Sequence, residues 1–120
     1  MSLPHAESGQ VINIRPLSGK IKESLSTALF KATELEVMRL VLEAGKEIPE
    51  HSVTGEITIH CLEGAIELRA HGTTQTLRHG EMVYLAGNQP YSIRAQEDAS
   101  VLMTVSLKRN GDSSSAGIKS

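Results

Sequence analysis

The feature that most constrains the fold is a series of turn-forming residues that divides the chain from Gly45 onward into short apolar segments. These turn signals stand at Gly45, Gly55, Gly64, His71-Gly72, His79-Gly80, Gly87-Asn88 and Gln96-Glu97-Asp98. The segments between them are too short for ordinary helices but suit β-strands. They cover residues 57–62, 65–70, 75–78, 82–85, 91–95 and 100–107. Short strands separated regularly by turns predict an all-β sandwich or barrel.

The segment that precedes these strands, residues 21–47, fits two structures. Its apolar residues recur at helical spacing and most of its residues favour helix. Residues 34–43 also alternate as a strand would, with one side chain on each face in turn. We predict a strand for residues 34–43, because the segments that follow are strands.

The ends of the chain differ in composition from its centre. Residues 1–20 contain Pro4, Gly9, Pro16 and Gly19 and predict an irregular N-terminal arm. Residues 21–109 predict a single β domain, and a chain of 120 residues can bury one core. Residues 110–120 are polar and rich in Ser and Gly, so we predict a disordered tail.

The composition argues against nucleic acid and membranes as partners. The formal net charge is −2, no segment collects the basic residues, and only three aromatic residues could stack on bases. No apolar run is long enough to span a bilayer, and the N-terminus does not read as a signal peptide. We therefore expect a cytoplasmic protein, and the single Cys61 is compatible with that compartment.

Two stretches resemble the conserved motifs of the cupin superfamily. Residues 45–64 read GKEIPEHSVTGEITIHCLEG, with five residues between Gly45 and His51 and a Leu-Glu-Gly ending. Residues 80–95 read GEMVYLAGNQPYSIRA and match the second motif chiefly in the opening Gly80. The resemblance implies one RmlC-like cupin of the cupin-2 type, a jelly-roll barrel of two antiparallel sheets, and a homodimer, as is common in small cupins. It implies little about the reaction, because cupins include several enzyme classes and non-enzymes.

The metal site of the superfamily is largely missing from this sequence. In metal-binding cupins, two His and one Glu of the first motif and one His of the second hold Fe, Mn, Ni or Zn, which such ligands suit. The matching positions are His51, Val53, Ile57 and Tyr91. Since one imidazole is a poor metal site, we expect no cofactor. The second-motif turn also reads Asn88 for Gly, but Asn tolerates a left-handed backbone and can preserve that turn.

Two registers at the turn after Val53 remain open. If Val53 lies opposite Ile57, then Ile57, Ile59 and Cys61 join His51 inside the barrel and His60 points outward. A tighter Thr54-Gly55 turn would instead place His51, Glu56, Thr58 and His60 on one face, where a divalent transition metal could bind. The alternation of apolar residues favours the first register.

The favoured register predicts a small organic ligand in the barrel, with His51 and Tyr91 holding its polar end. The expected pocket residues are His51, Ile57, Ile59, Cys61, Tyr91 and Met103. The alternative is a metal-dependent oxygenase or isomerase with a site on His51 and His60, and whether the chain is an enzyme stays open. A third hypothesis is a purely associative module that pairs through its outer sheet face and arm. We expect Cys61 to be an inert core thiol.

Overall fold

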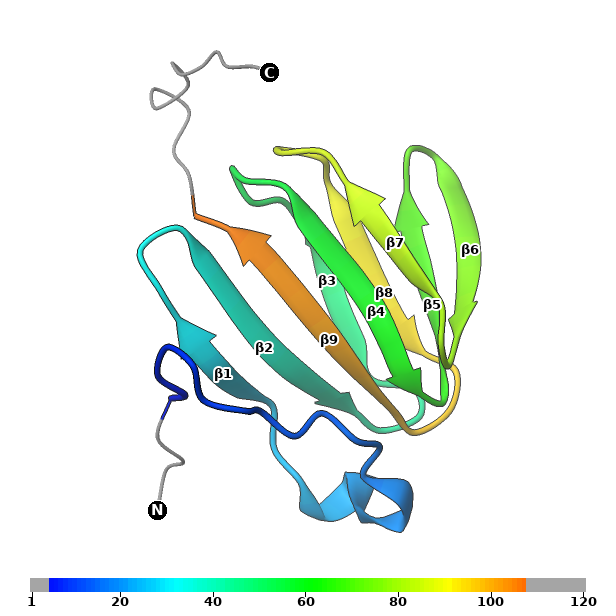
Figure 1. The fold of residues 1–120 in the computed structure, drawn as a ribbon. Coiled ribbons are helices and arrows are strands. Elements are labelled where there is room, and N and C mark those ends of the chain that lie inside the picture. The colour runs from blue at the N-terminus through cyan, green and yellow to red at the C-terminus, as the bar shows by residue number, and fades with distance from the viewer. Residues whose placement is uncertain (1–4, 108–120) are drawn as a thin grey trace.

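The computed structural model describes residues 5–107, which form two antiparallel β-sheets packed face to face (Figure 1). One sheet has five strands in the order β1-β2-β9-β4-β7, and the other has four in the order β3-β8-β5-β6. The strands are β1 (Thr27–Lys31), β2 (Leu35–Leu42), β3 (Glu47–His51), β4 (Ile57–Glu63), β5 (Ala65–Ala70), β6 (Thr73–Arg78), β7 (Met82–Leu85), β8 (Tyr91–Ala95) and β9 (Ala99–Ser106). The predicted jelly-roll barrel of two antiparallel sheets is confirmed.

Strand β2 settles the choice between helix and strand in favour of strand. All eight of its residues pair with β9, from Leu35 opposite Ser106 to Leu42 opposite Ala99. Leu42 is buried in the core and Leu40 packs against it, so the inner face follows the period of two. Pairing across the sheet therefore overrides the helical propensity of the segment.

The segment between β3 and β4 differs from both predicted hairpins. β3 pairs with β8 in the four-stranded sheet, whereas β4 pairs with β7 and β9 in the other sheet. Residues 52–56 therefore cross from one sheet to the other, held by hydrogen bonds from the Asn88 N–H to the Val53 carbonyl and from the Ser106 N–H to the Glu56 carbonyl. A Cβ on Gly55 would collide with the Ser106 carbonyl, so this crossing requires glycine.

The core lies between the two sheets and is built from their inward-facing residues. On β4, Ile57, Ile59 and Cys61 are 2%, 0% and 0% exposed, while Thr58 and His60 alternate with them on the outer face. Fully buried residues from the other strands complete it, including Ile66, Leu68, Ile93 and Val101. The burial predicted for Ile57, Ile59 and Cys61 is thus confirmed, although the hairpin on which it was based does not form.

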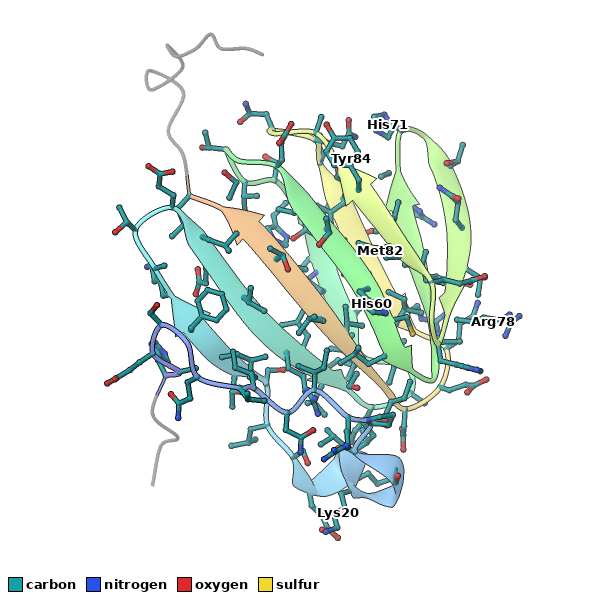
Figure 2. All side chains as sticks on the ribbon, in the orientation of Figure 1. Lys20, His60, His71, Arg78, Met82 and Tyr84 are labelled. Carbon is teal, nitrogen blue, oxygen red and sulfur yellow. The ribbon has the colours of Figure 1, made fainter. Side chains whose placement is uncertain are left out.

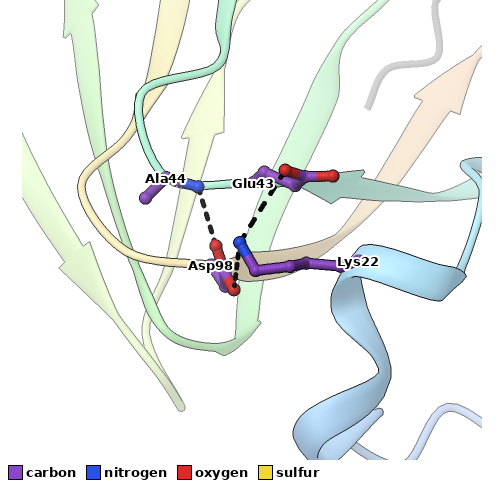
Figure 3. A network of polar contacts seen from close by, with 4 residues as sticks. All are labelled: Lys22, Glu43, Ala44 and Asp98. Atoms are coloured by element: carbon purple, nitrogen blue, oxygen red, sulfur yellow. Dashed lines mark hydrogen bonds and ion pairs between the residues drawn. The ribbon is translucent and has the colours of Figure 1, made fainter.

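One end of the barrel is closed by a short polar network (Figure 3). The Asp98 carboxylate accepts a hydrogen bond of 2.8 Å from the Ala44 N–H and lies 3.7 Å from the Lys22 ammonium, which also pairs with Glu43. Nearby, Gly64 has a φ of +79° and packs against the Asp98 carbonyl so closely that a Cβ would not fit. We call this the closed end of the barrel.

The N-terminal arm crosses the outer face of the five-stranded sheet (Figure 1). Residues 5–17 contain no helix or strand, and a 3-10 helix, η1 (Ser18–Glu23), follows. The arm is attached by a hydrogen bond from the Ala6 N–H to the Leu29 carbonyl and by two N–H hydrogen bonds to the Glu63 carboxylate.

The predicted tail, residues 110–120, lies outside the described residues. None of the helices described is long and apolar enough to cross a membrane.

Candidate functional site

A cavity of about 410 Å³ opens between the two sheets at the end of the barrel opposite the closed end. We call it the mouth cavity. It lies where β2 begins and where β3 and β9 end, beside the crossing segment 52–56. Its lining residues are Glu36, Met38, His51, Val53, Thr54, Gly55, Tyr91, Met103, Val105, Ser106 and Leu107. Most of the cavity surface is apolar, so the few polar groups determine how a molecule would be oriented there.

His51 and Tyr91 form the polar pair of the mouth cavity. They are register partners on β3 and β8, and their rings lie 4.7 Å apart at an angle of 48°. The Tyr91 hydroxyl is 3.2 Å from Nε2 of His51. Tyr91 is 2% exposed, whereas His51 is solvent-exposed at the rim. The pair thus links the cavity interior to its opening.

The hydrogen bonds of His51 determine which atoms carry protons. Nδ1 lies 3.0 Å from the Pro49 carbonyl, which can only accept, so Nδ1 carries a proton. In the neutral imidazole Nε2 must then accept from the Tyr91 hydroxyl. In the imidazolium Nε2 donates instead, and the Tyr91 proton can turn to the sulfur of Met103, 3.7 Å away. The Tyr91 hydroxyl can therefore serve as donor or acceptor according to the charge of His51.

Burial favours the protonated form of the Tyr91 hydroxyl. Removal from water disfavours a phenolate and raises the pKa of Tyr91 above its usual value. Tyr91 is therefore a neutral phenol at physiological pH. It suits hydrogen bonding to a ligand better than it suits proton abstraction.

The structure brings together only part of the predicted pocket. His51, Tyr91 and Met103 line the mouth cavity, as the sequence analysis proposed for the ligand site. Ile57, Ile59 and Cys61 do not line it and instead lie in the core, although Ile57 and Ile59 pair with the lining residues Val105 and Met103 of β9. The physical reason is that alternation along β4 determines which face of the sheet a residue occupies, but not which strands border the cavity, and no residue of β4 borders it.

Glu36 is the lining residue of greatest chemical interest that the sequence analysis missed. It is half-buried on the inner face of β2, opposite Val105, and borders the mouth cavity. No hydrogen bond or ion pair joins its carboxylate to another residue between 5 and 107. The signal was present, because the alternation of residues 34–43 placed Glu36 on the same face as Met38 and Leu42.

Cys61 has the environment of an unreactive thiol. Its sulfur donates to the carbonyls of Glu63 and Gly64, at 3.4 and 3.6 Å, and the side chain is fully buried. Burial, together with the nearby carboxylates of Glu81, Glu63 and Glu97, raises the pKa of Cys61 to about 11. The thiolate is the nucleophilic form of cysteine, so Cys61 is inert near neutral pH.

His60 lies on the opposite face of β4 from the mouth cavity. Its register partners are Met82 on β7 and Leu102 on β9, and Figure 2 shows its side chain on the outer side of the five-stranded sheet near Met82. The structure therefore does not bring His51 and His60 together, which the metal-dependent alternative requires. His71 and His79 are exposed at turns, and His71 adopts a φ of +56°.

The donor set at the mouth cavity does not fit the metal ion that related folds hold. Of the four family ligand positions, Val53 and Ile57 carry hydrocarbon side chains and Tyr91 carries a neutral phenol. The cavity is also lined by Glu36, whose carboxylate together with His51 gives two donors. Across residues 5–107, no three His, Cys, Asp or Glu side chains are grouped as a metal ion needs. The turn of the second motif nevertheless survives, because Asn88 adopts the left-handed φ of +66°.

Comparisons with solved structures agree on the fold. A conserved protein of unknown function from Streptococcus pyogenes, SPY1581, is 21% identical, with a TM-score of 0.70 over 91% of this chain and 97% of that one. A cupin superfamily protein from Desulfitobacterium hafniense, DSY2733, is 14% identical, with a TM-score of 0.71 over 86% of this chain and its own whole length.

An enzyme is also among the similar structures. Salicylate 1,2-dioxygenase from Pseudaminobacter salicylatoxidans is 24% identical, with a TM-score of 0.58 over 60% of this chain and 21% of that one. At such identities the likeness concerns the fold alone. No curated protein sequence matches the chain significantly.

The sequence profile of the cupin domain family matches residues 38–107, more than half of the chain. This range runs from within β2 to just past the end of β9 and includes every lining residue of the mouth cavity except Glu36. The profile, the two antiparallel sheets and the cupins among the similar structures agree. The chain belongs to the cupin family.

Proposed function

We propose that this cupin binds a small organic molecule in the mouth cavity without a metal ion, with an apolar body against Met38, Met103 and Val105. The observation that carries this proposal is the buried Tyr91 hydroxyl, hydrogen-bonded to the exposed His51 in an otherwise mainly apolar cavity. A volume of about 410 Å³ is within the range of small-molecule sites.

The polar groups define the kind of ligand head that would bind. Tyr91 and His51 can each donate or accept, whereas Glu36 only accepts when ionised. A hydroxyl or carbonyl head can use the Tyr91–His51 pair, and a hydroxyl can also donate to a carboxylate. The negative charge of Glu36 disfavours anionic heads. We therefore propose small alcohols, phenols and ketones as the ligand class.

Saturation-transfer NMR with phenol, cyclohexanol and cyclohexanone tests the proposal. Tyr91→Phe is expected to weaken binding about tenfold, as the loss of a buried hydrogen bond does. His60→Ala, on the outer face of β4, is the matched control and should bind as the wild type does. Binding that survives both Tyr91→Phe and His51→Ala would overturn the proposal.

Elemental analysis of the purified protein tests whether the chain holds a metal ion. Growth in medium supplemented with iron, manganese, nickel and zinc should yield protein with far less than one metal ion per chain. Stoichiometric metal that is lost in a His51→Ala variant would overturn the metal-free proposal. It would favour the oxygenase or isomerase alternative instead.

We also propose a homodimer, formed in the cytoplasm through the outer face of the five-stranded sheet. Met82 and Tyr84 are 58% and 59% exposed on β7, an edge strand, and Figure 2 shows them near His60. The strand register continues this outer surface through His60 to Leu102 of β9. Large apolar side chains exposed together on the outer face of a sheet are typical of an interface. Sedimentation should report a dimer that Met82→Glu dissociates and Thr74→Glu, on the other sheet, leaves intact. A wild-type monomer would contradict this.

A further inference from the structure

A second cavity, of about 660 Å³, lies outside the barrel between the N-terminal arm and strands β1 and β2. We call it the arm cavity. The arm contributes His5, Asn13 and Leu17 to its lining, and the segment that follows contributes residues 23–29. It is separate from the mouth cavity, because it lies on the outer face of the five-stranded sheet and shares no lining residue with it.

Arg39 of β2 borders the arm cavity and is 7% exposed. It faces outward from the sheet, opposite Thr27 of β1 and Leu102 of β9, beneath the arm. Its Nε is fully buried and has no hydrogen-bond partner. No hydrogen bond or ion pair of 4.0 Å or less joins its guanidinium to another residue of the described chain.

The carboxylates near Arg39 form no ion pair with it. Glu63 acts on Arg39 through space and favours its charged form, but both Glu63 oxygens already accept N–H bonds, from Leu17 and Ser18. Glu23 also borders the arm cavity, but it is exposed and forms no ion pair with Arg39. Burial lowers the pKa of Arg39, although a guanidinium stays charged in proteins.

The buried and unpartnered Nε of this cation is unfavourable, because its lost hydration is not replaced. An anion in the adjacent cavity would replace that lost hydration. The planar fork of a guanidinium matches a carboxylate with two parallel hydrogen bonds. The walls contributed by Leu17, Leu25 and Leu29 suit an apolar chain, and the hydroxyls of Ser24 and Ser26 lie at the same cavity.

From these observations we propose that the arm cavity is a binding site for a small organic carboxylate, with its carboxylate on Arg39 and its apolar part under the arm. A single negative charge suits the site better than a phosphate, because Glu23 repels the second charge and the walls are largely aliphatic. This site is independent of the ligand proposed for the mouth cavity.

The test uses hexanoate as the probe and 1-hexanol as its uncharged analogue. Titration of the full-length protein, followed through the arginine Nε–H signals by NMR, should show a saturable shift of the Arg39 signal with hexanoate and none with 1-hexanol. Arg39→Met should weaken hexanoate binding at least about tenfold. Arg69→Met, which removes an exposed arginine of the other sheet, is the matched control and should leave binding unchanged.

Thermal unfolding and the variant Arg39→Lys provide a second test, in case Arg39→Met alters the fold. Hexanoate should raise the melting temperature of the wild type but not that of Arg39→Met. Arg39→Lys keeps the charge but not the fork, and it should bind with intermediate affinity. Tyr91→Phe should bind hexanoate like the wild type, which separates this site from the mouth cavity.

Two results would overturn the proposal. One is equal binding of hexanoate by the wild type and a folded Arg39→Met variant. The other is a site that takes inorganic phosphate or acetate as tightly as hexanoate, because the apolar walls would then contribute nothing.

Discussion

The two ends of this barrel are made from the same strands but are filled differently. At the closed end, Leu42 and Cys61 are buried and Gly64 packs directly against the Asp98 backbone. The Asp98 carboxylate links two turns by accepting a hydrogen bond from the Ala44 N–H. At the mouth, the same sheets leave a cavity of about 410 Å³ bordered by Tyr91 and an exposed His51. The contrast suggests that one end supplies stability and the other end supplies binding.

A pair of truncations on the inner face of β2 provides the strongest test of this contrast. Leu42→Ala removes a side chain that is 3% exposed at the closed end and should cost about 3 kcal/mol of unfolding free energy. Met38→Ala removes a half-buried side chain beside an existing cavity and should cost only about 1 kcal/mol. Urea unfolding followed by far-UV circular dichroism measures both. Equal losses would show that the mouth is packed as tightly as the closed end.

Glycine substitutions compare the backbone of the two ends. Gly64→Ala places a Cβ against the Asp98 carbonyl at a φ of +79°, so we expect a loss of about 2–3 kcal/mol. Gly72 has a similar φ of +73° in the β5–β6 turn, but no atom lies within 4 Å of its Cβ position. Gly72→Ala therefore isolates the conformational cost, about 1 kcal/mol. Comparable losses in urea would mean that close packing at Gly64 contributes nothing.

Alkaline pH tests the packing around the Cys61 thiol. The pKa of Cys61 rises from 9.0 to about 11 in the folded protein, so its contribution to stability is complete below pH 9 and is lost as the pH rises towards 11. Between pH 8 and 10.5 this loss should be about 2 kcal/mol. Urea unfolding at the two values should show a smaller decline for Cys61→Ala. Burial also raises the pKa of Tyr91, so ionisation of Tyr91 destabilises the folded protein at high pH as well. The wild type and Cys61→Ala share that effect.

The polar network of the closed end should give the smallest effects. Asp98→Ala leaves the Ala44 N–H without its acceptor and should cost about 1 kcal/mol. Lys22→Ala should cost less than about 0.5 kcal/mol, because the Lys22 side chain is 68% exposed and its ion pairs are screened by water. Thermal melts at low and high salt distinguish the effect of the hydrogen bond from that of the ion pairs. A larger loss for Lys22→Ala would show that the ion pairs stabilise this end more than the hydrogen bond does.

Much of the fold could be predicted because alternation and turn residues are local signals. The predicted strands 65–70, 82–85 and 91–95 have the bounds of β5, β7 and β8. β3 was missed as a strand because Pro49 and charged residues hide its periodicity. Its pairing with β8 rather than with β4 depends on contacts between residues distant in sequence, which a local pattern does not contain.

The candidate site was predicted less completely than the fold. His51 and Tyr91 were identified from motif positions and Met103 was expected in the same pocket, and the structure places all three at the mouth cavity. Ile57 was placed there as well, although it belongs to the packed core. Arg39 could not be recognised, because its isolation depends on how the arm lies over β2 and on the shortage of counter-charges there.

The placement of the two tyrosines gives this protein its own optical reporters. Tyr91 is buried beside the mouth cavity, Tyr84 is exposed on β7, and the chain contains no tryptophan to mask their emission. Occupation of the cavity would change the surroundings of Tyr91 and leave those of Tyr84 unchanged. In a Tyr91→Phe variant the remaining emission would come from Tyr84, so subtracting the two spectra would separate events inside the barrel from events on its surface.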